Sequence, residues 1–118
     1  MLSEFLKCVE NPEKERAYTI AFETEEFTAL YAPTEQPIFA TVSISYVPRD
    51  ACVEQMSLKV YLGSFRGERV YYEEVINQIA DDLVAVCDPL SLSVMGDFTV
   101  RGGISTRVKV DCEREGGT

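Results

Sequence analysis

The order in which strand-like and helix-like patterns follow one another limits the folds open to this chain. Residues 17–23 and 38–47 alternate apolar and polar side chains, as half-buried strands do. Residues 53–65 and 71–87 then have helical spacing, and residues 90–112 alternate again on both sides of a glycine turn at 101–103. This strand, strand, helix, helix, strand, strand order predicts an α+β fold and excludes a doubly wound nucleotide-binding domain.

The same order predicts a four-stranded antiparallel sheet, with two helices between its second and third strands covering one face. The segment 27–37 is expected to be a loop that presents the side chain of Tyr31. Both sheet edges are bare in a monomer, and closing a ring edge to edge removes them, so we expect a homo-oligomer. A chain of 118 residues is long enough for one core, so we expect a single domain over 1–118, loosely ordered at 1–15 and 113–118.

Composition excludes several kinds of chemistry. The chain has no histidine, which removes Ser-His-Asp and Cys-His nucleophiles and His-ligated zinc, and we expect no metal. Its net charge of −9 opposes binding to nucleic acid and anionic lipid.

No apolar run is long enough to span a membrane, and the first residues lack the order of a signal peptide, so we expect a cytoplasmic protein. Its scattered cysteines are then expected to be reduced: Cys8, Cys52, Cys87 and Cys112.

Several segments of the sequence resemble those of the NADPH-dependent 7-cyano-7-deazaguanine reductases, the nitrile reductases of queuosine biosynthesis. The matching words are FTALY and TEQPIFATVSISYVP within 27–48, EQMSLKVYLGSFR at 54–66, VYYEEVINQIADDLVAVCDPL at 70–90 and GDFTVRGGIS at 96–105. The resemblance implies the tunnelling fold of that family and a purine-like or deazapurine ligand bound at subunit interfaces. It also implies NADPH as cofactor and a pentameric ring or a decamer of two stacked rings.

The residues that carry the family's chemistry are replaced in this chain. Tyr31 stands where the family has the cysteine that attacks the nitrile carbon to form a thioimide, and Ile38 stands where it has a proton-donating aspartate. Met56 replaces the first lysine of the family's cofactor-associated motif on the first helix. Of a His-Glu pair that holds the deazaguanine, the histidine is replaced by Tyr72 and the glutamate is retained as Glu73. No catalytic residue of the family is therefore retained.

These replacements matter chemically. A phenol with a pKa near 10 is only about 0.1% ionised at pH 7, and an isoleucine donates no proton. We therefore expect a homologue that binds the family's kind of ligand but has lost thioimide chemistry. The alternative is an active nitrile reductase, or an amidine-forming relative, with an unidentified nucleophile. Cys52 is a candidate for that role, although such a cysteine also serves as a small buried hydrophobe.

The resemblance also assigns the binding residues. It implies ligand contacts for Val53, Glu54, Gln55, Tyr72 and Glu73, and weaker cofactor contacts for Ser57, Lys59 and Tyr61.

Each candidate binding residue also has a structural interpretation. The Glu73 carboxylate suits two donors on the edge of a guanine-like ring, but a glutamate in a first helical turn is also stabilised by the helix dipole. Arg66 either caps the first helix or contacts a phosphate or a partner. Tyr31 and Tyr72 either fill a vacated pocket or stack on a flat ring.

Overall fold

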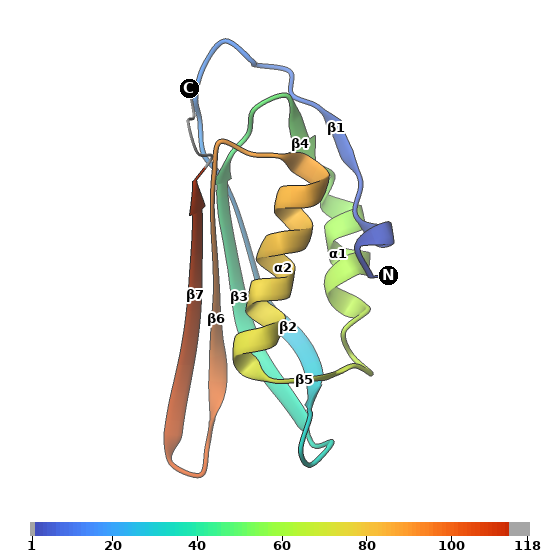
Figure 1. Cartoon of the computed structure of the whole chain (residues 1–118), viewed down its shortest axis with the longest axis vertical. Helices are drawn as coiled ribbons and strands as arrows, with labels where there is room; N and C mark the ends of the chain where they lie inside the picture. Colours follow the sequence, from blue (N-terminus) through green and yellow to red (C-terminus); the bar gives the residue numbers. More distant parts are fainter. Residues whose placement is uncertain (1, 114–118) are drawn as a thin grey trace.

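The structure, a computed structural model, describes residues 2–113 and consists of a mixed sheet with two helices packed on one face (Figure 1). Its elements in chain order are the 3-10 helix η1 (Leu2–Phe5), β1 (Cys8–Glu10), β2 (Ile20–Tyr31), β3 (Pro37–Val47), β4 (Ala51–Val53), α1 (Gln55–Gly63), β5 (Arg69–Val70), α2 (Tyr72–Cys87), β6 (Ser91–Arg101) and β7 (Ile104–Glu113). The strand order in the sheet is β5-β2-β3-β6-β7, and β1 pairs with β4 in a separate ribbon.

The four long strands, β2, β3, β6 and β7, run antiparallel, and both helices lie between β3 and β6 in the chain. The predicted α+β order is therefore confirmed. The prediction of a four-stranded, wholly antiparallel sheet is wrong, because β5 adds a fifth strand that runs parallel to β2. A strand of two residues has too few positions to show an alternating pattern, so β5 could not be recognised from the sequence.

The expected loop at 27–37 is also wrong over its first half. The pairing of β2 with β3 shifts register between Thr24 and Phe27, and β2 then continues to Tyr31. Such a bulge interrupts the alternation of side chains, which made one long strand look like a strand followed by a loop. The connection from β2 to β3 is short, and Glu35 within it has a φ of 60°.

Helix α2 supplies much of the core. Its buried stripe packs against the sheet and consists of Val75, Ile76, Ile79, Ala80, Leu83 and Cys87. Gly96 of β6 lets the helix come close, because a Cβ built there would lie 2.5 Å from Cδ1 of Ile76. The predicted glycine turn between β6 and β7 is confirmed, with φ values of 59° at Gly102 and 78° at Gly103.

The N-terminal segment packs beside α1. Within its described part, the segment 1–15 that we expected to be loosely ordered forms η1 and β1. The backbone N–H of Glu54 donates to the carbonyl of Lys7 at 2.9 Å, which joins β1 to the start of α1. Met1 and residues 114–118, which hold most of the other segment expected to be loose, lie outside the described residues. Among the helices of residues 2–113, none has the length and apolar character needed to cross a membrane.

Candidate functional site

The short strand β5 brings the start of α2 to the end of β2. Tyr31 is the last residue of β2 and pairs with Val70, and α2 begins two residues later at Tyr72. The rings of Tyr31 and Tyr72 are consequently stacked, with centroids 5.4 Å apart and planes inclined by 29°. The two positions to which the resemblance assigns a cysteine and a histidine thus hold two tyrosines in contact.

Further aromatic rings extend this stack. The Tyr72 ring also packs on Phe98 of β6, with centroids 4.4 Å apart, and the Tyr31 ring meets Tyr71 edge-on at 6.1 Å. The sequence did not indicate that Tyr71 and Phe98 belong to this cluster. The Tyr72 ring has aromatic neighbours on two sides, which is how a side chain that fills a pocket is placed.

Ile38 lies one strand away from this cluster. It pairs with Ala29 across β2 and β3, is 2% exposed and belongs to the hydrophobic core. An isoleucine has no proton to give, and the apolar surroundings would penalise a charged carboxylate at this position. The side chain at position 38, to which the resemblance assigns a proton-donating aspartate, therefore supplies no proton.

The predicted ligand residue Glu73 is open to solvent. It is exposed in the first turn of α2, where the helix dipole favours a negative charge. The neighbouring carboxylate of Glu74 instead accepts from the backbone N–H of Tyr71 at 3.4 Å. Within residues 2–113, the Glu73 carboxylate has no hydrogen-bond or ion-pair partner.

The other predicted ligand residues are at the start of α1. The Glu54 carboxylate caps this helix, accepting from the N–H groups of Met56 at 2.8 Å and Ser57 at 2.9 Å. Val53 is buried and its N–H donates to the Tyr46 hydroxyl at 2.9 Å. Gln55 is exposed, so its amide is the polar side chain of this group that is open to a ligand.

These two groups lie at opposite ends of α2. The Cys87 thiol, at the end of α2, donates to the carbonyl of Ala51 at 3.1 Å, which fixes the start of α1 near that end (Figure 1). The other group opens α2, and 16 residues at about 1.5 Å per residue separate the two ends by roughly 22 Å. We call residues 72–73 the α2 half-site and residues 53–55 the α1 half-site. One chain does not bring them together.

The three predicted cofactor residues have different environments. The Ser57 hydroxyl is buried and accepts from the backbone N–H of Lys7 at 3.0 Å. The Tyr61 hydroxyl is buried, donates to Oδ2 of Asp82 at 2.6 Å, and has a pKa raised first by burial and then by that carboxylate. Lys59 is exposed, so its ammonium is the group of the three that is open to a cofactor.

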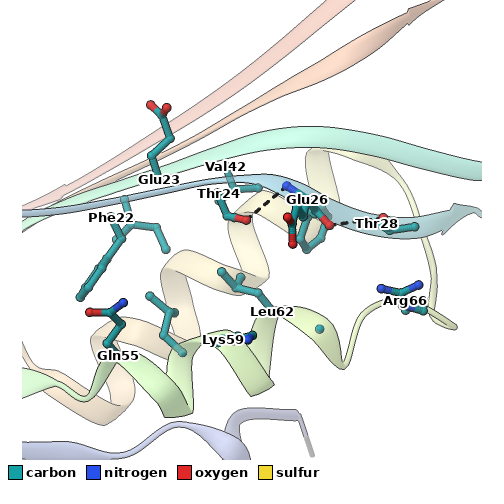
Figure 2. Close-up of a pocket in the computed structure, with 14 residues that line it drawn as sticks. Phe22, Glu23, Thr24, Glu26, Thr28, Val42, Gln55, Lys59, Leu62 and Arg66 are labelled. Carbon is teal, nitrogen blue, oxygen red and sulfur yellow. Dashed lines mark hydrogen bonds between the residues drawn. The ribbon is translucent and has the colours of Figure 1, made fainter.

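Lys59 lies in a surface pocket of about 340 Å³ between α1 and β2 (Figure 2). Gln55 and Arg66 also line this pocket, and in the described part of the chain neither Lys59 nor Arg66 has an ion-pair partner. Glu23 and Glu26 also line the pocket, and the Glu23 carboxylate points away from α1 in Figure 2. The pocket thus offers two cations to an anionic group. No cluster of three potential metal ligands is found among residues 2–113.

Comparison with known proteins agrees with this architecture. A family profile described as "QueF-like protein" matches residues 37–116. The chain is 46% identical over 113 residues to the NADPH-dependent 7-cyano-7-deazaguanine reductase of Magnetococcus marinus, covering 96% of this chain and 88% of the relative. It is 50% identical over 106 residues to the reductase of the same name from Anaeromyxobacter sp. (strain K), covering 90% and 87%. The chain belongs to the QueF-like family.

A solved structure supports the fold assigned to this QueF-like chain. The apo crystal structure of the archaeosine synthase QueF-Like superposes with a TM-score of 0.74 over 79% of this chain and 91% of that one. The two share 19% sequence identity, so the match shows a shared fold and leaves the chemistry open. The tunnelling fold implied by the sequence words is therefore supported, with a five-stranded mixed sheet.

Proposed function

We propose that this protein binds a purine-like or deazapurine heterocycle between two subunits and has lost the thioimide chemistry of nitrile reduction. The observation that carries this proposal is the stack of Tyr31 on Tyr72, with Ile38 buried nearby. A ring occupies the position of the nucleophile and another occupies that of the ligand-holding histidine. The protein acts in the cytoplasm as a homo-oligomer, a pentameric ring or two stacked rings.

Binding requires two subunits because the half-sites lie at opposite ends of α2, a helix roughly 22 Å long. The α2 half-site contributes the unpartnered Glu73 carboxylate, which accepts from donors on the edge of a guanine-like ring. The α1 half-site of the next subunit contributes Gln55 and the backbone around Glu54, whose carboxylate caps α1. Apart from its last two residues, β2 has no strand partner on its outer side within residues 2–113, so this edge is open to pairing with β7 of another copy.

The cofactor pocket has fewer cationic side chains than the family resemblance implies. The curated relatives are named NADPH-dependent, and NADPH supplies a hydride when bound. Lys59 and Arg66 are the residues that would hold its phosphates, because they are exposed cations in one pocket without ion-pair partners. Met56 places an apolar side chain where the family has a further lysine, so the pocket fits an anionic group with one cation fewer.

Calorimetry with 7-cyano-7-deazaguanine tests the binding proposal. The wild-type protein should bind, and Glu73→Ala should weaken binding by about 1.5–3 kcal/mol, roughly 10- to 150-fold, since it removes a charged acceptor. Asp81→Ala is the matched control, because it removes an exposed carboxylate from the same helix away from its first turn. Absence of binding to guanine, deazaguanines and pterins, or an affinity unchanged by Glu73→Ala, would contradict the proposal.

An active reductase is the second candidate, and the identity of 46–50% to proteins named as reductases favours it. The nucleophile would then be Cys52, which immediately precedes the α1 half-site. Its sulfur is nearly buried and lies 3.7 Å from the Tyr18 hydroxyl. NADPH-dependent nitrile reduction by the unmodified protein, abolished by Cys52→Ala, would establish this candidate and overturn the loss of chemistry.

A further inference from the structure

Cysteines that are far apart in the sequence lie close together where the β1–β4 ribbon meets the C-terminal end of α2. Cys8 belongs to β1, Cys52 to β4, and Cys87 is the last residue of α2. All have free thiols, as does Cys112 on β7. Neither the proposed ligand site nor the proposed cofactor pocket uses the thiols of Cys8 and Cys87.

Cys8 and Cys87 face each other across this junction. The Cys8 thiol donates to the carbonyl of Val86, the residue before Cys87, at 3.5 Å. The Cys87 thiol donates to the carbonyl of Ala51 at 3.1 Å, and Ala51 lies two residues before Val53, the strand partner of Cys8. These contacts place both thiols at the same junction.

Cys52 points to the other side of the ribbon. In the pairing of β1 with β4, Cys8 lies opposite Val53 and Cys52 lies opposite Val9. Adjacent residues of a strand point to opposite faces, so the side chains of Cys52 and Val53 diverge. Val53 and Cys8 face the core, whereas Cys52 contacts the Tyr18 hydroxyl. The geometry therefore singles out one pair among the three cysteines.

We propose that Cys8 and Cys87 form a reversible intrachain disulfide when the protein meets a peroxide. Cys8 is half-buried and Cys87 is 4% exposed, so Cys8 reacts first. Its thiolate attacks one peroxide oxygen, the O–O bond breaks, and hydroxide leaves to give a sulfenic acid. The Cys87 sulfur then attacks the Cys8 sulfur and displaces hydroxide. Two thiols and one hydrogen peroxide give one disulfide and two waters, and a dithiol reductant restores the thiols.

The bond would fasten the N-terminal segment to the α1 half-site. Lys7, the residue before Cys8, accepts from the Glu54 N–H at 2.9 Å and donates to the Ser57 hydroxyl at 3.0 Å. A cross-link at Cys8 holds these hydrogen bonds in place. It also closes a long loop, from residue 8 to residue 87, and so restricts the unfolded chain strongly.

Burial governs how fast the disulfide forms. Burial is the main cause that raises the pKa of the Cys8 thiol, and it raises the pKa of Cys87 to about 12. A thiolate is the attacking species, so oxidation is slow at neutral pH and accelerates as the pH rises. After burial, the neighbouring Cys87 thiol lowers the pKa of Cys8, whereas Cys8 raises the pKa of Cys87, which agrees with Cys8 as the attacking residue.

Native protein treated with hydrogen peroxide near the ordinary thiol pKa of about 8.5, then unfolded and alkylated, tests the proposal by mass spectrometry. The expected product is a monomer lighter by two hydrogens, in which Cys52 and Cys112 are alkylated and Cys8 and Cys87 are linked. Its melting temperature should exceed that of the dithiothreitol-reduced protein by at least about 5 °C. Cys8→Ser and Cys87→Ser should each abolish the product, whereas Cys52→Ser and Cys112→Ser should retain it.

The wild-type result is decisive even where a variant fails to fold. A Cys8–Cys52 link, an interchain disulfide as the main product, or alkylation of both Cys8 and Cys87 after peroxide treatment would each overturn the proposal. So would a disulfide that forms equally fast in protein unfolded by urea, because the folded contacts would then contribute nothing.

Discussion

The position of the two half-sites at opposite ends of α2 predicts that defective subunits can repair one another. Glu73→Ala removes the carboxylate of the α2 half-site. Gln55→Arg places a guanidinium in the α1 half-site, where it pairs with the Glu73 carboxylate of the neighbouring subunit and competes with the ligand. Both positions are exposed, so neither change disturbs the core. Each variant alone should bind 7-cyano-7-deazaguanine weakly at every interface.

Rings assembled from equal amounts of the two variants should recover part of the binding. An interface is intact when the subunit that supplies Glu73 carries Gln55→Arg and the neighbour that supplies Gln55 carries Glu73→Ala. Each condition holds for half of the subunits, so about one quarter of the interfaces regain two native halves. The recovered sites should have the wild-type affinity, because nothing in them is changed.

Calorimetry measures this stoichiometry directly after the mixed variants have been unfolded together and refolded. The control is the same mixture prepared from separately assembled rings, which should contain no tight sites before subunits exchange. Wild-type protein that binds the ligand, combined with mixed rings that contain no tight sites, would refute the proposed division of the site between subunits. A light-scattering mass equal to the 13.2 kDa monomer would refute it as well.

Three further predictions concern the chemistry and the core. Tyr31→Cys combined with Ile38→Asp should form a covalent adduct with 7-cyano-7-deazaguanine that mass spectrometry detects; its absence in a folded, ligand-binding variant would show that the pocket no longer holds the nitrile for attack. Gly96→Ala should lower the free energy of unfolding by about 1–3 kcal/mol in urea titrations, because its Cβ would lie 2.5 Å from Ile76, whereas Gly63→Ala, with nothing within 4 Å, should cause no loss. Burial raises the pKa of Tyr46 to about 12, so its contribution to stability is complete below pH 10 and decreases by about 2–3 kcal/mol as the pH rises from 10 to 12. Tyr46→Phe should reduce that alkaline loss, and an unchanged loss would contradict this assignment.

The sequence predicted the elements that bury one regular face. Strands β3 and β6 and helix α2 each present apolar residues at a fixed period, and the structure buries these residues in the core, whereas the alternating residues Val108, Val110 and Cys112 of β7 are partly buried against it. It could not predict β5, which has one exposed and one buried residue. It also misjudged Phe27–Tyr31, because the bulge after Thr24 changes which positions face inward.

The geometry of the candidate site depends on the features that the sequence did not predict, β5 and the end of β2. Tyr31 meets Tyr72 only because β5 pairs with the end of β2 and α2 begins directly after it. The family resemblance assigned both residues to a site, but their contact with each other arises from the tertiary structure. Similarly, no local pattern indicated that the hydroxyls of Ser57 and Tyr61 form hydrogen bonds with Lys7 and Asp82. Lys59 is therefore the exposed member of the three predicted cofactor residues.

The contact between Tyr31 and Tyr72 also explains why the replaced positions must be considered together. A stacked aromatic pair contributes about 0.5–1.5 kcal/mol beyond its buried area, so a tyrosine at one position favours an aromatic residue at the other. Ile38 pairs with Ala29, two residues before Tyr31, and extends the same apolar environment. A cysteine introduced at position 31 alone would still face the Tyr72 ring and would still lack a proton donor. Under the proposed function, positions 31, 72 and 38 therefore form one unit, and returning the family residue at a single position would restore neither the space nor the proton that reduction needs.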